Sequence, residues 1–519
     1  MKALALFAAL GAVGGTAAAA GADDWRSLFL GWRTKQPAML EAVRPDVSVT
    51  PLMTVGERLR NGYRFESIPD GIAFKQQGSN VDVYVSHETS TVPFPFTPAT
   101  GVGFNDFTNA MVSKLTLNHS ARILTGEYVI PSEANFQRFC SSFLAGAEHG
   151  FDREILFQNE EATDFVNRTG EAWPARPGAE QAGLVVAYDV ASGEYKPIYG
   201  MGRHNHENSV ALPGYGEPVV LSGDDTFSAP ASQLYLYNAD SRAQLWADQG
   251  RLYAFRSSNA AVNDYGDLSG TASVAGSFIP VPEAIAKGDQ TALEDWSNAN
   301  NVFQFIRVED IAYDRNTPNV VYFADTGEPR AVPSAATGRL ARAAAGTLGP
   351  YPNGRLFRMV LDPANPLNVR SLSILIDADT GGYGNVNVIH QPDNVETTGS
   401  SLLIQEDPGS HNQGQTNARI WRYDLSSKAL EVVARVDQSQ RPLTPLGGWE
   451  SSGIIDVSRE FNEGGDDEGG LSFLLDVQAH RPTNAPCPGG ATFGPQCVPE
   501  TVEDGQLLFL RQADNGNNN

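Results

Sequence analysis

The sequence predicts an all-β fold: a β-propeller, with six blades of four strands each and a few short helical insertions. The composition is the first observation, because 51 glycines and 32 prolines separate short runs of Val, Ile, Leu, Tyr and Phe, as in strands joined by turns. The second is a motif that recurs six times in the same order: a strand-like run bounded by acidic residues. Each recurrence is followed by another apolar strand or strand pair, so one repeat supplies the inner and outer strands of a blade.

The acids of the six runs fall at comparable places. They are Asp70 and Glu88; Glu160 and Glu161, in a run that opens on Cys140; Glu207, Asp224 and Asp225; Glu309, Asp310 and Asp325; Asp393, Glu406 and Asp407; and Glu450 and Asp476. The inner strands of a propeller line a central channel, so these acids should meet there. Crowded carboxylates repel each other at neutral pH unless cations neutralise them, which predicts a centre of several metal ions. The alternatives are coincidental acids in turns and a pair of β-sandwiches.

The remaining elements are placed by their own patterns. Apolar runs that begin near residues 111, 184, 234, 355 and 419, and the run 506–511, are predicted as outer strands. A short helix is expected over residues 282–298, and another over residues 339–345. Both would be insertions in a β framework.

The N-terminus resembles a secretory signal over residues 1–22. Lys2 precedes an apolar run from Ala3 to Val13, and Ala20-Gly-Ala22 is a small-residue cleavage site. No twin-arginine pair is present, which favours export of the unfolded chain by a Sec-type route and metal loading outside the cytoplasm. The sequence therefore predicts a secreted or periplasmic protein with an N-terminal arm (23–60), a propeller (61–511) and a disordered tail (512–519).

The net charge of −24 excludes some partners. An acidic surface disfavours nucleic acid and anionic membranes. No stretch after the signal is long and apolar enough to span a bilayer, so stable membrane insertion is not expected. We expect a monomer that acts on small molecules.

The chain has three cysteines. Cys487 and Cys497 bracket a turn-rich loop, and a disulfide between them would suit an exported protein. Cys140 is then left over. It is either a buried inert thiol or a thiolate ligand of a metal ion.

Two arginines lie beside candidate ligands. Arg203 precedes Glu207 in a stretch with two histidines, a composition that suits a metal ion and an oxyanion, or else a hydrogen-bonded network. Strand spacing places Arg307 and Glu309 on one face and Asp310 on the other. The pair is a simple salt bridge, or Arg307 binds a phosphoryl group while Glu309 holds a metal ion that the same group bridges. The oxygen ligands of Asp393 and Glu450 favour calcium or magnesium.

Taken together, several short stretches resemble the PhoX family of exported alkaline phosphatases. These stretches are distributed over most of the mature chain. In chain order they are Cys140-Ser-Ser with Glu160-Glu161, Asn205-His-Glu207, Gly223-Asp-Asp225, Arg307-Val-Glu309-Asp310, Pro392-Asp-Asn394 and Trp449-Glu450-Ser. The resemblance implies a propeller that hydrolyses phosphate monoesters at a channel site with iron and several calcium ions.

The same resemblance implies roles for individual residues. Cys140, Glu160 and Glu161 would lie at the iron. Glu207, Glu309, Asp393 and Glu450 would contribute to the iron or calcium ligands, with Asp225, Asp310 and Glu406 as further candidates. Arg307 would bind the phosphoryl oxygens, helped by Arg203.

Three functions are consistent with this reading. The first is an exported metal-dependent phosphomonoesterase that releases inorganic phosphate from organic esters. The second is a calcium-dependent propeller lactonase or phosphodiesterase. The third is a non-enzymatic binding propeller whose blades are held by calcium.

Overall fold

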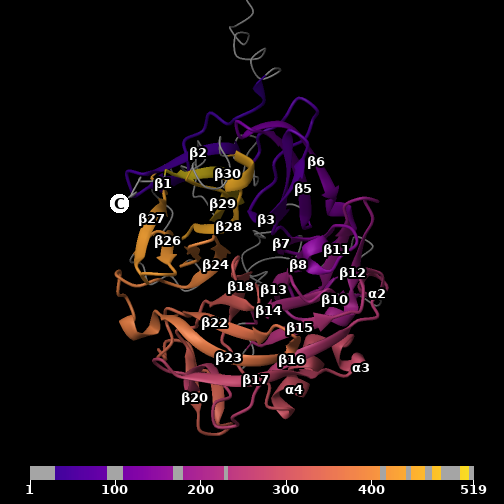
Figure 1. Cartoon of the computed structure of the whole chain (residues 1–519). Helices are drawn as coiled ribbons and strands as arrows, with labels where there is room; N and C mark the ends of the chain where they lie inside the picture. Colours follow the sequence, from indigo (N-terminus) through magenta and orange to yellow (C-terminus); the bar gives the residue numbers. More distant parts are fainter. Residues whose placement is uncertain are drawn as a thin grey trace, which may run out of the picture.

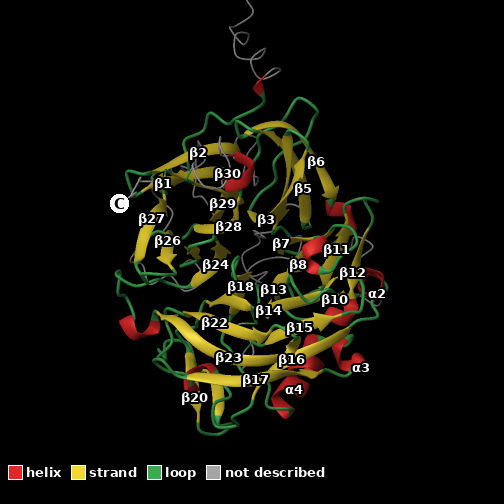
Figure 2. Cartoon of the chain, viewed as in Figure 1, coloured by secondary structure: helices red, strands yellow, loops and turns green. Residues whose placement is uncertain are grey.

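A computed structural model describes residues 30–90, 109–166, 179–226, 232–408, 416–439, 446–461, 470–480 and 503–513. The predicted signal, Cys487, Cys497 and most of the predicted tail lie outside these residues. The described chain is mostly β, and its sheets are arranged around a common centre as in a propeller (Figures 1 and 2). The all-β prediction is therefore confirmed.

Six strands lie nearest the centre. They are β3 (Pro69–Gln77), β7 (Phe139–Ala145), β13 (His206–Ala211), β18 (Val308–Tyr313), β24 (Pro392–Thr397) and β28 (Glu450–Asp456). Each of these inner strands contacts the next one in chain order, and β28 contacts β3. The contacts form a closed ring, which places the starts of all six runs around one axis.

The remaining strands extend each sheet outward by antiparallel pairing. The first two sheets are β3 with β4 (Asn80–His87), β5 (Met111–Asn118) and β6 (Arg122–Ile130), and β7 with β8 (Ile155–Glu160), β11 (Val185–Asp189) and β12 (Tyr195–Ile198). The next is β13 with β14 (Val219–Asp224), β15 (Leu234–Asn238) and β16 (Arg251–Ser257). It continues through β17 (Ser273–Pro280) to β23 (Asn365–Asp377), β22 (Arg355–Asp362), β19 (Val320–Asp325) and β18. The strands predicted near residues 111, 184, 234, 355 and 419 are all present.

The last two sheets take strands from the N-terminal region. β24 is followed by β25 (Ser401–Glu406), β26 (Arg419–Asp424), β27 (Leu430–Val436) and β1 (Leu40–Ala42). β28 is followed by β29 (Leu471–His480), β30 (Glu503–Gln512) and β2 (Val47–Thr54). The pairing of β2 with β30 completes the final sheet with a segment from the other end of the chain. This pairing ties the N-terminal region to the end of the ring, because the second and the last described strands share one set of hydrogen bonds.

The second strand of each sheet shows how the sequence specifies this packing. β8, β14, β19 and β25 are buried at every position. Such strands are covered on both faces by neighbouring sheets, so they contain near-continuous apolar runs rather than alternating ones. Their last residues approach the centre, where polar groups replace the apolar ones.

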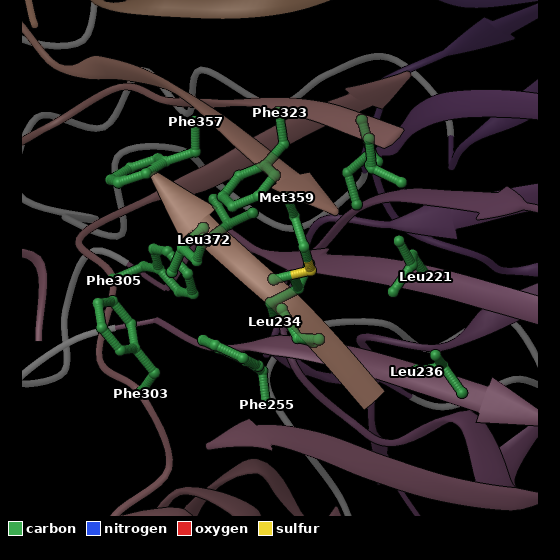
Figure 3. Packing of buried hydrophobic residues seen from close by; sticks show 14 of the residues in the cluster. Leu221, Leu234, Leu236, Phe255, Phe303, Phe305, Phe323, Phe357, Met359 and Leu372 are labelled. Carbon is green, nitrogen blue, oxygen red and sulfur yellow. The ribbon is translucent and has the colours of Figure 1, made fainter. Parts of the chain in front are cut away.

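A cluster of aromatic rings fills the space between the β13–β16 and β18–β22 strands (Figure 3). The centroids of Phe303 and Phe305 are 4.7 Å apart, and those of Phe323 and Phe357 are 5.2 Å apart. Offset and tilted ring pairs at these distances contribute about 0.5–1.5 kcal/mol each beyond their buried area. The cluster packs against the start of β18, which carries Glu309 and directly follows Arg307.

Helices are short and peripheral. They are α2 (Arg242–Trp246), α3 (Glu283–Ala286), α4 (Gln290–Ala299) and α5 (Ser458–Phe461), besides several 3₁₀ turns. The segment 282–298, predicted as one short helix, is helical but is divided into two helices, α3 and α4. No helix in the described ranges is long and apolar enough to cross a bilayer.

The second predicted helix, over residues 339–345, is wrong. Residues Arg339–Arg342 form β21, which pairs with β20 (Ala331–Ser334) in a hairpin. Arg339 donates Nη2 to the Val302 carbonyl at 2.6 Å, and Leu340 is buried in the aromatic cluster. These tertiary contacts outweigh the helix propensity of the Arg-Leu-Ala sequence. β9 (Phe165–Val166) and β10 (Glu180–Gln181) form another two-stranded antiparallel sheet.

Candidate metal centre

A β-bulge occurs in every inner strand at the point nearest the centre. In five strands the register shifts across one pair of residues, and the pairs are Asp70-Gly71, Cys140-Ser141, Glu207-Asn208, Glu309-Asp310 and Asp393-Asn394. In β28 the shift falls at Gly453. A bulge sets two residues against one on the partner strand and redirects their side chains. The first member of each pair can therefore enter the acid cluster while the second faces elsewhere along the channel.

A repeated hydrogen bond positions the ends of the second strands. The backbone amide of the residue that follows the second strand is the donor. It donates to the carbonyl of the residue two positions before the first member of the bulge pair. Examples are Glu88 to Ile68 at 3.1 Å and Glu161 to Arg138 at 2.9 Å. The same bond joins Asp225 to Asn205, Thr326 to Arg307 and Asp407 to Gln391. Five acid-bearing strand ends are thus brought to the same level as the bulge acids.

Left-handed backbone accompanies this arrangement in three sheets. Ile68, Arg138 and Gln391 have φ values of 37°, 41° and 54°, and each lies two residues before its ligand candidate. Positive φ is uncommon for such residues, and it concentrates where function requires an unusual chain direction. The chain turns there so that Asp70, Cys140 and Asp393 point to the centre.

Nine side chains form one connected cluster. Their ligand atoms fall into four groups, within each of which all atoms lie within 4.8 Å of one another. The groups are Asp70, Glu88 and Cys140; Cys140, Glu161 and Glu207; Glu207, Glu309 and Asp393; and Asp393, Asp407 and Glu450. Because Cys140, Glu207 and Asp393 are each shared by two groups, the groups form a continuous chain of potential sites.

The sequence-predicted residues Cys140, Glu161, Glu207, Glu309, Asp393 and Glu450 are all brought together in this cluster. Asp70, Glu88 and Asp407 are further members. Asp70 opens the first acidic run, and Glu88 and Asp407 each end a run. The sequence alone does not separate them from acids with a purely structural role, because their place in the cluster depends on the bulges and on the ends of the second strands. Asp70 and Glu207 are almost fully buried, whereas Glu88, Glu161, Asp393 and Asp407 are half-buried. The cluster is therefore partly accessible to solvent.

Cys140 lies at the junction of two groups. Its Sγ is 3.0 Å from Asp70 Oδ2 and 3.1 Å from Glu207 Oε1, and it can donate to either oxygen. Burial raises the pKa of the Cys140 thiol well above its usual value, and the charges of Asp70 and Glu207 raise it further. A nearby cation would reverse this effect, since the thiolate is the metal-binding form.

Burial also dominates the acids. It raises the pKa values of Asp70, Glu207 and Glu309 well above the usual range, and neighbouring carboxylates add to the effect. The same holds for Glu161, Asp393 and Glu450. Carboxylates packed this closely need protons or cations to compensate their charge.

Arg307 lies at the edge of the cluster and is buried. Its Nε and Nη2 donate to Asp225 Oδ1 and Oδ2, both at 2.6 Å, and Nη2 lies 3.3 Å from Glu309 Oε1. Thr326 also donates its hydroxyl to Glu309 Oε1. The predicted sharing of one face by Arg307 and Glu309 is confirmed, and Asp225 orients the guanidinium rather than joining one of the four groups.

His480 contacts the cluster from the opposite edge. Its Nε2 is 3.3 Å from Glu450 Oε1, and its Nδ1 is 2.9 Å from Glu503 Oε2. Burial lowers the pKa of His480, but Glu503 and Glu450 outweigh it and raise the pKa well above the usual value. No sequence pattern indicates His480, because its acidic neighbours Glu450 and Glu503 come from other strands.

Two other predicted ligands, Glu160 and Glu406, lie apart from the four groups. Glu160 accepts the amides of Gln137 at 2.8 Å and Leu184 at 3.1 Å. Glu406 accepts the His390 amide at 2.7 Å and pairs with Arg419 at 2.8 Å. Each carboxylate thus binds the backbone just before the inner strand of its own sheet, as Asp325 does for Ile306.

Asp310 and Arg203 have other partners as well. Asp310 accepts the amide of Val395 at 2.9 Å and lies below the cluster. Arg203 pairs with Glu180 at 3.0 Å and lies over the ring of Tyr199. Neither side chain forms a hydrogen bond or ion pair with the nine cluster residues in the described chain, although the charge of Asp310 contributes, after burial, to raising the pKa of Asp70.

The residues present fit a polymetal centre. Eight carboxylates offer the hard oxygen atoms that calcium prefers, and one thiol offers a softer ligand suited to iron or zinc. Both oxygens of Asp476, on β29, have no hydrogen-bond partner among the described residues, although this aspartate is fully buried beside the cluster. Burial raises the pKa of Asp476 well above its usual value, followed by the charges of Asp70 and Glu450. The local environment is thus short of positive charge, and bound cations would supply it.

Comparisons with known proteins agree with this chemistry. The family model described as "Alkaline phosphatase PhoX" matches residues 133–440, more than half of the chain. No curated protein matches the sequence. The match places the protein in a class, the phosphoric monoester hydrolases of the alkaline phosphatase type.

Within that class, the chain belongs to the PhoX family. Six of the nine cluster residues lie inside the matched range, whereas Asp70, Glu88 and Glu450 lie outside it. The sheets on both sides of the match therefore complete the cluster.

Two solved structures are distantly similar. An α-L-arabinofuranosidase of Fusarium graminearum is 8% identical with a TM-score of 0.36, over 88% of this chain and 97% of that one. An α-L-arabinanase of Penicillium chrysogenum is 9% identical with a TM-score of 0.36, over 88% of this chain and 98% of that one. At these scores the likeness is too distant to support an inference about function.

Proposed function

We propose that this PhoX-family protein is an exported, metal-dependent phosphomonoesterase that releases inorganic phosphate from organic phosphate esters. The observation that supports this most directly is the connected cluster, in which shared residues join four potential metal groups beside one buried arginine. A secreted or periplasmic location and a monomeric state are parts of the same proposal. We also propose that the ring comprises six blades of four strands, joined around the six inner strands.

The proposed metal complement is several calcium ions together with iron. Cys140, shared by two groups, would hold iron with Glu161 and Glu207, because a thiolate favours a softer ion than calcium. The all-oxygen groups around Asp393, Asp407 and Glu450 would hold calcium, which accepts variable numbers of oxygen ligands. When bound, such cations would supply positive charge to the phosphoryl oxygens and lower the pKa of a water molecule for in-line attack.

Arg307 is the proposed phosphoryl-binding residue. Its guanidinium remains charged at every relevant pH and is held in place by two hydrogen bonds to Asp225. The Nη2 edge, beside Glu309, adjoins the cluster where a phosphoryl group would bridge the ions. A preorganised donor there would stabilise the charge that develops on the equatorial oxygens. Arg203 would contribute only if its pairing with Glu180 were released.

The surrounding residues would exclude solvent and hold the ligands. Asp70 Oδ1 accepts the hydroxyl of Ser452, and Glu88 Oε2 accepts Nε2 of Gln478 at 3.1 Å. These bonds fix the carboxylates on one edge and leave their other lone pairs for cations. His480 would hold Glu450 in the same way on the opposite edge.

A substrate panel tests the proposal. The purified protein, supplied with calcium and iron, should hydrolyse a generic aryl phosphate monoester faster than the corresponding diester or a simple lactone. Preference for the diester or the lactone would favour the alternative hydrolases. Absence of turnover of all three, with metals shown to be bound, would leave a metal-stabilised binding protein and would end the phosphatase proposal.

A further inference from the structure

A cavity of about 430 Å³ continues the central channel beyond the acid cluster. The later residues of all six inner strands line it, whereas none of the nine cluster residues does so. The bulges explain the division, since the second member of each bulge pair faces the cavity while the first belongs to the cluster. The second members are Gly71, Ser141, Asn208, Asp310 and Asn394.

Two of these side chains carry oxygens without partners. Asn208 Oδ1 and Asn394 Oδ1 have no hydrogen bond within the described part of the chain, although the residues are only 6% and 3% exposed. Buried amide oxygens are normally paired, so two of them in one cavity indicate that something else satisfies them.

Asp310 lies between these two asparagines. Asn208 donates Nδ2 to Asp310 Oδ1, and the amide of Val395, next to Asn394, donates to Asp310 Oδ2 at 2.9 Å. Each carboxylate oxygen can accept two hydrogen bonds, so Oδ2 retains a free lone pair. One carboxylate and two amide groups whose oxygens lack partners therefore line the same cavity on neighbouring strands.

The cations that line the cavity are already paired with other acids. Lys75 Nζ binds Glu154 Oε2 at 2.7 Å, and Arg315 binds Glu396. Asp310 has no ion pair with any residue that the structure describes. Its charge is left for a ligand that enters the cavity.

We propose that Asn208, Asp310 and Asn394 bind a calcium ion, separate from the catalytic cluster. Calcium accepts carboxylate and amide oxygens in flexible geometry and completes its ligands with water. At about 30 Å³ for each water, the cavity has room for the ion and several waters. The ion would link β13, β18 and β24, which carry the three ligands, beneath the cluster. The proposal does not depend on the phosphatase function.

The test is a calcium count on the double variant Asn208→Leu/Asn394→Leu. Leucine has a similar size and removes both oxygens. By elemental analysis after removal of free metal, we expect the variant to bind one calcium fewer per chain than the natural protein. Thr397→Val is the matched control, because Thr397 lines the same cavity but its hydroxyl already donates to the Tyr313 carbonyl at 2.8 Å. This control should keep the full count.

An unchanged count in the folded double variant would show that the two oxygens bind only water, and would overturn the proposal. If the double variant fails to fold, crystals of the natural protein grown with calcium decide the question by anomalous scattering. A peak beside Asp310 and the two asparagines supports the site. A cavity without such a peak contradicts it.

Discussion

Arg307 binds Asp225 through two parallel hydrogen bonds, Nε to Oδ1 and Nη2 to Oδ2, each 2.6 Å long. The two residues belong to neighbouring repeats along the ring, since Asp225 follows β14 and Arg307 precedes β18. The fork-to-fork geometry fixes the plane of the guanidinium. An arginine at the edge of the cluster is thus oriented before any substrate arrives.

Replacing Arg307 by lysine should impair catalysis more than folding. Lysine keeps the charge but cannot form the bidentate contact with Asp225 or present a planar edge to a phosphoryl group. We expect kcat for an aryl phosphate to fall about 10²–10³-fold, as when one preorganised transition-state donor is removed. Steady-state kinetics, with metal content measured on the same sample, checks this result.

Arg203→Lys is the comparison for that variant. Arg203 pairs with Glu180 and lies over Tyr199, away from the four ligand groups. We expect a much smaller loss of kcat than for Arg307→Lys. An equal loss at both positions would argue against the particular role of Arg307.

The adjacent glutamates Glu160 and Glu161 should behave differently. Glu161→Gln removes a member of a metal group, so we expect loss of bound metal and of activity with the fold retained. Glu160→Gln weakens the buried hydrogen bonds to Gln137 and Leu184, which should cost about 1–3 kcal/mol of unfolding free energy while the metals stay bound. Denaturant unfolding and elemental analysis of both variants separate the two outcomes. Metal loss in Glu160→Gln alone would reverse the assignment.

Cys140→Ser should remove the softer metal selectively. Serine keeps a polar side chain but lacks the thiolate. The thiolate is a soft ligand that suits iron, whereas calcium prefers oxygen ligands. We expect iron to be lost, together with any thiolate-to-iron absorption band, while most calcium remains. Ser141→Ala is the neighbouring control, because the Ser141 hydroxyl accepts Asn159 Nδ2 at 2.8 Å and does not belong to the cluster. Full iron content in Cys140→Ser would disprove the ligand role of the thiol.

The stability of the metal-free protein should fall as the pH rises. Burial, with repulsion among neighbours, raises the folded-state pKa values of Asp70, Glu207 and Glu309 above those of the unfolded chain. Above about pH 4, where unfolded carboxyls lose their protons, the folded protein therefore binds more protons than the unfolded one, and the unfolding free energy decreases with pH.

Calcium should reverse this trend, because it binds the ionised form. Thermal unfolding with chelator and with calcium, between about pH 5 and about pH 8, compares the two slopes. A Tm that rises with pH in the chelated protein would contradict the assignment of these carboxyls to one buried cluster.

Much of the fold could be predicted because the repeat is visible in the sequence. Fully buried second strands such as β8 and β19 contain apolar runs that end on acids, and their spacing indicates a common centre. The hairpin at Arg339–Arg342 could not be predicted, because its pairing depends on contacts with Val302 and Gln304 from a distant segment.

The site was harder to predict residue by residue. Glu160 and Glu161 are chemically identical neighbours, and only the end of β8 decides that the first accepts backbone amides while the second faces the cluster. Likewise, Glu309 and Asp310 form the bulge of β18, where Glu309 joins the cluster and Asp310 lines the cavity. Bulges depend on strand pairing, so they leave little trace in a single sequence.

The most direct test of the central claim is a metal inventory of the purified protein, made beside phosphatase activity before and after chelation. We expect several metal ions per chain, loss of activity when a chelator removes them, and recovery when calcium and iron are restored. A folded protein that hydrolyses phosphate monoesters at full rate with no bound metal would contradict the account.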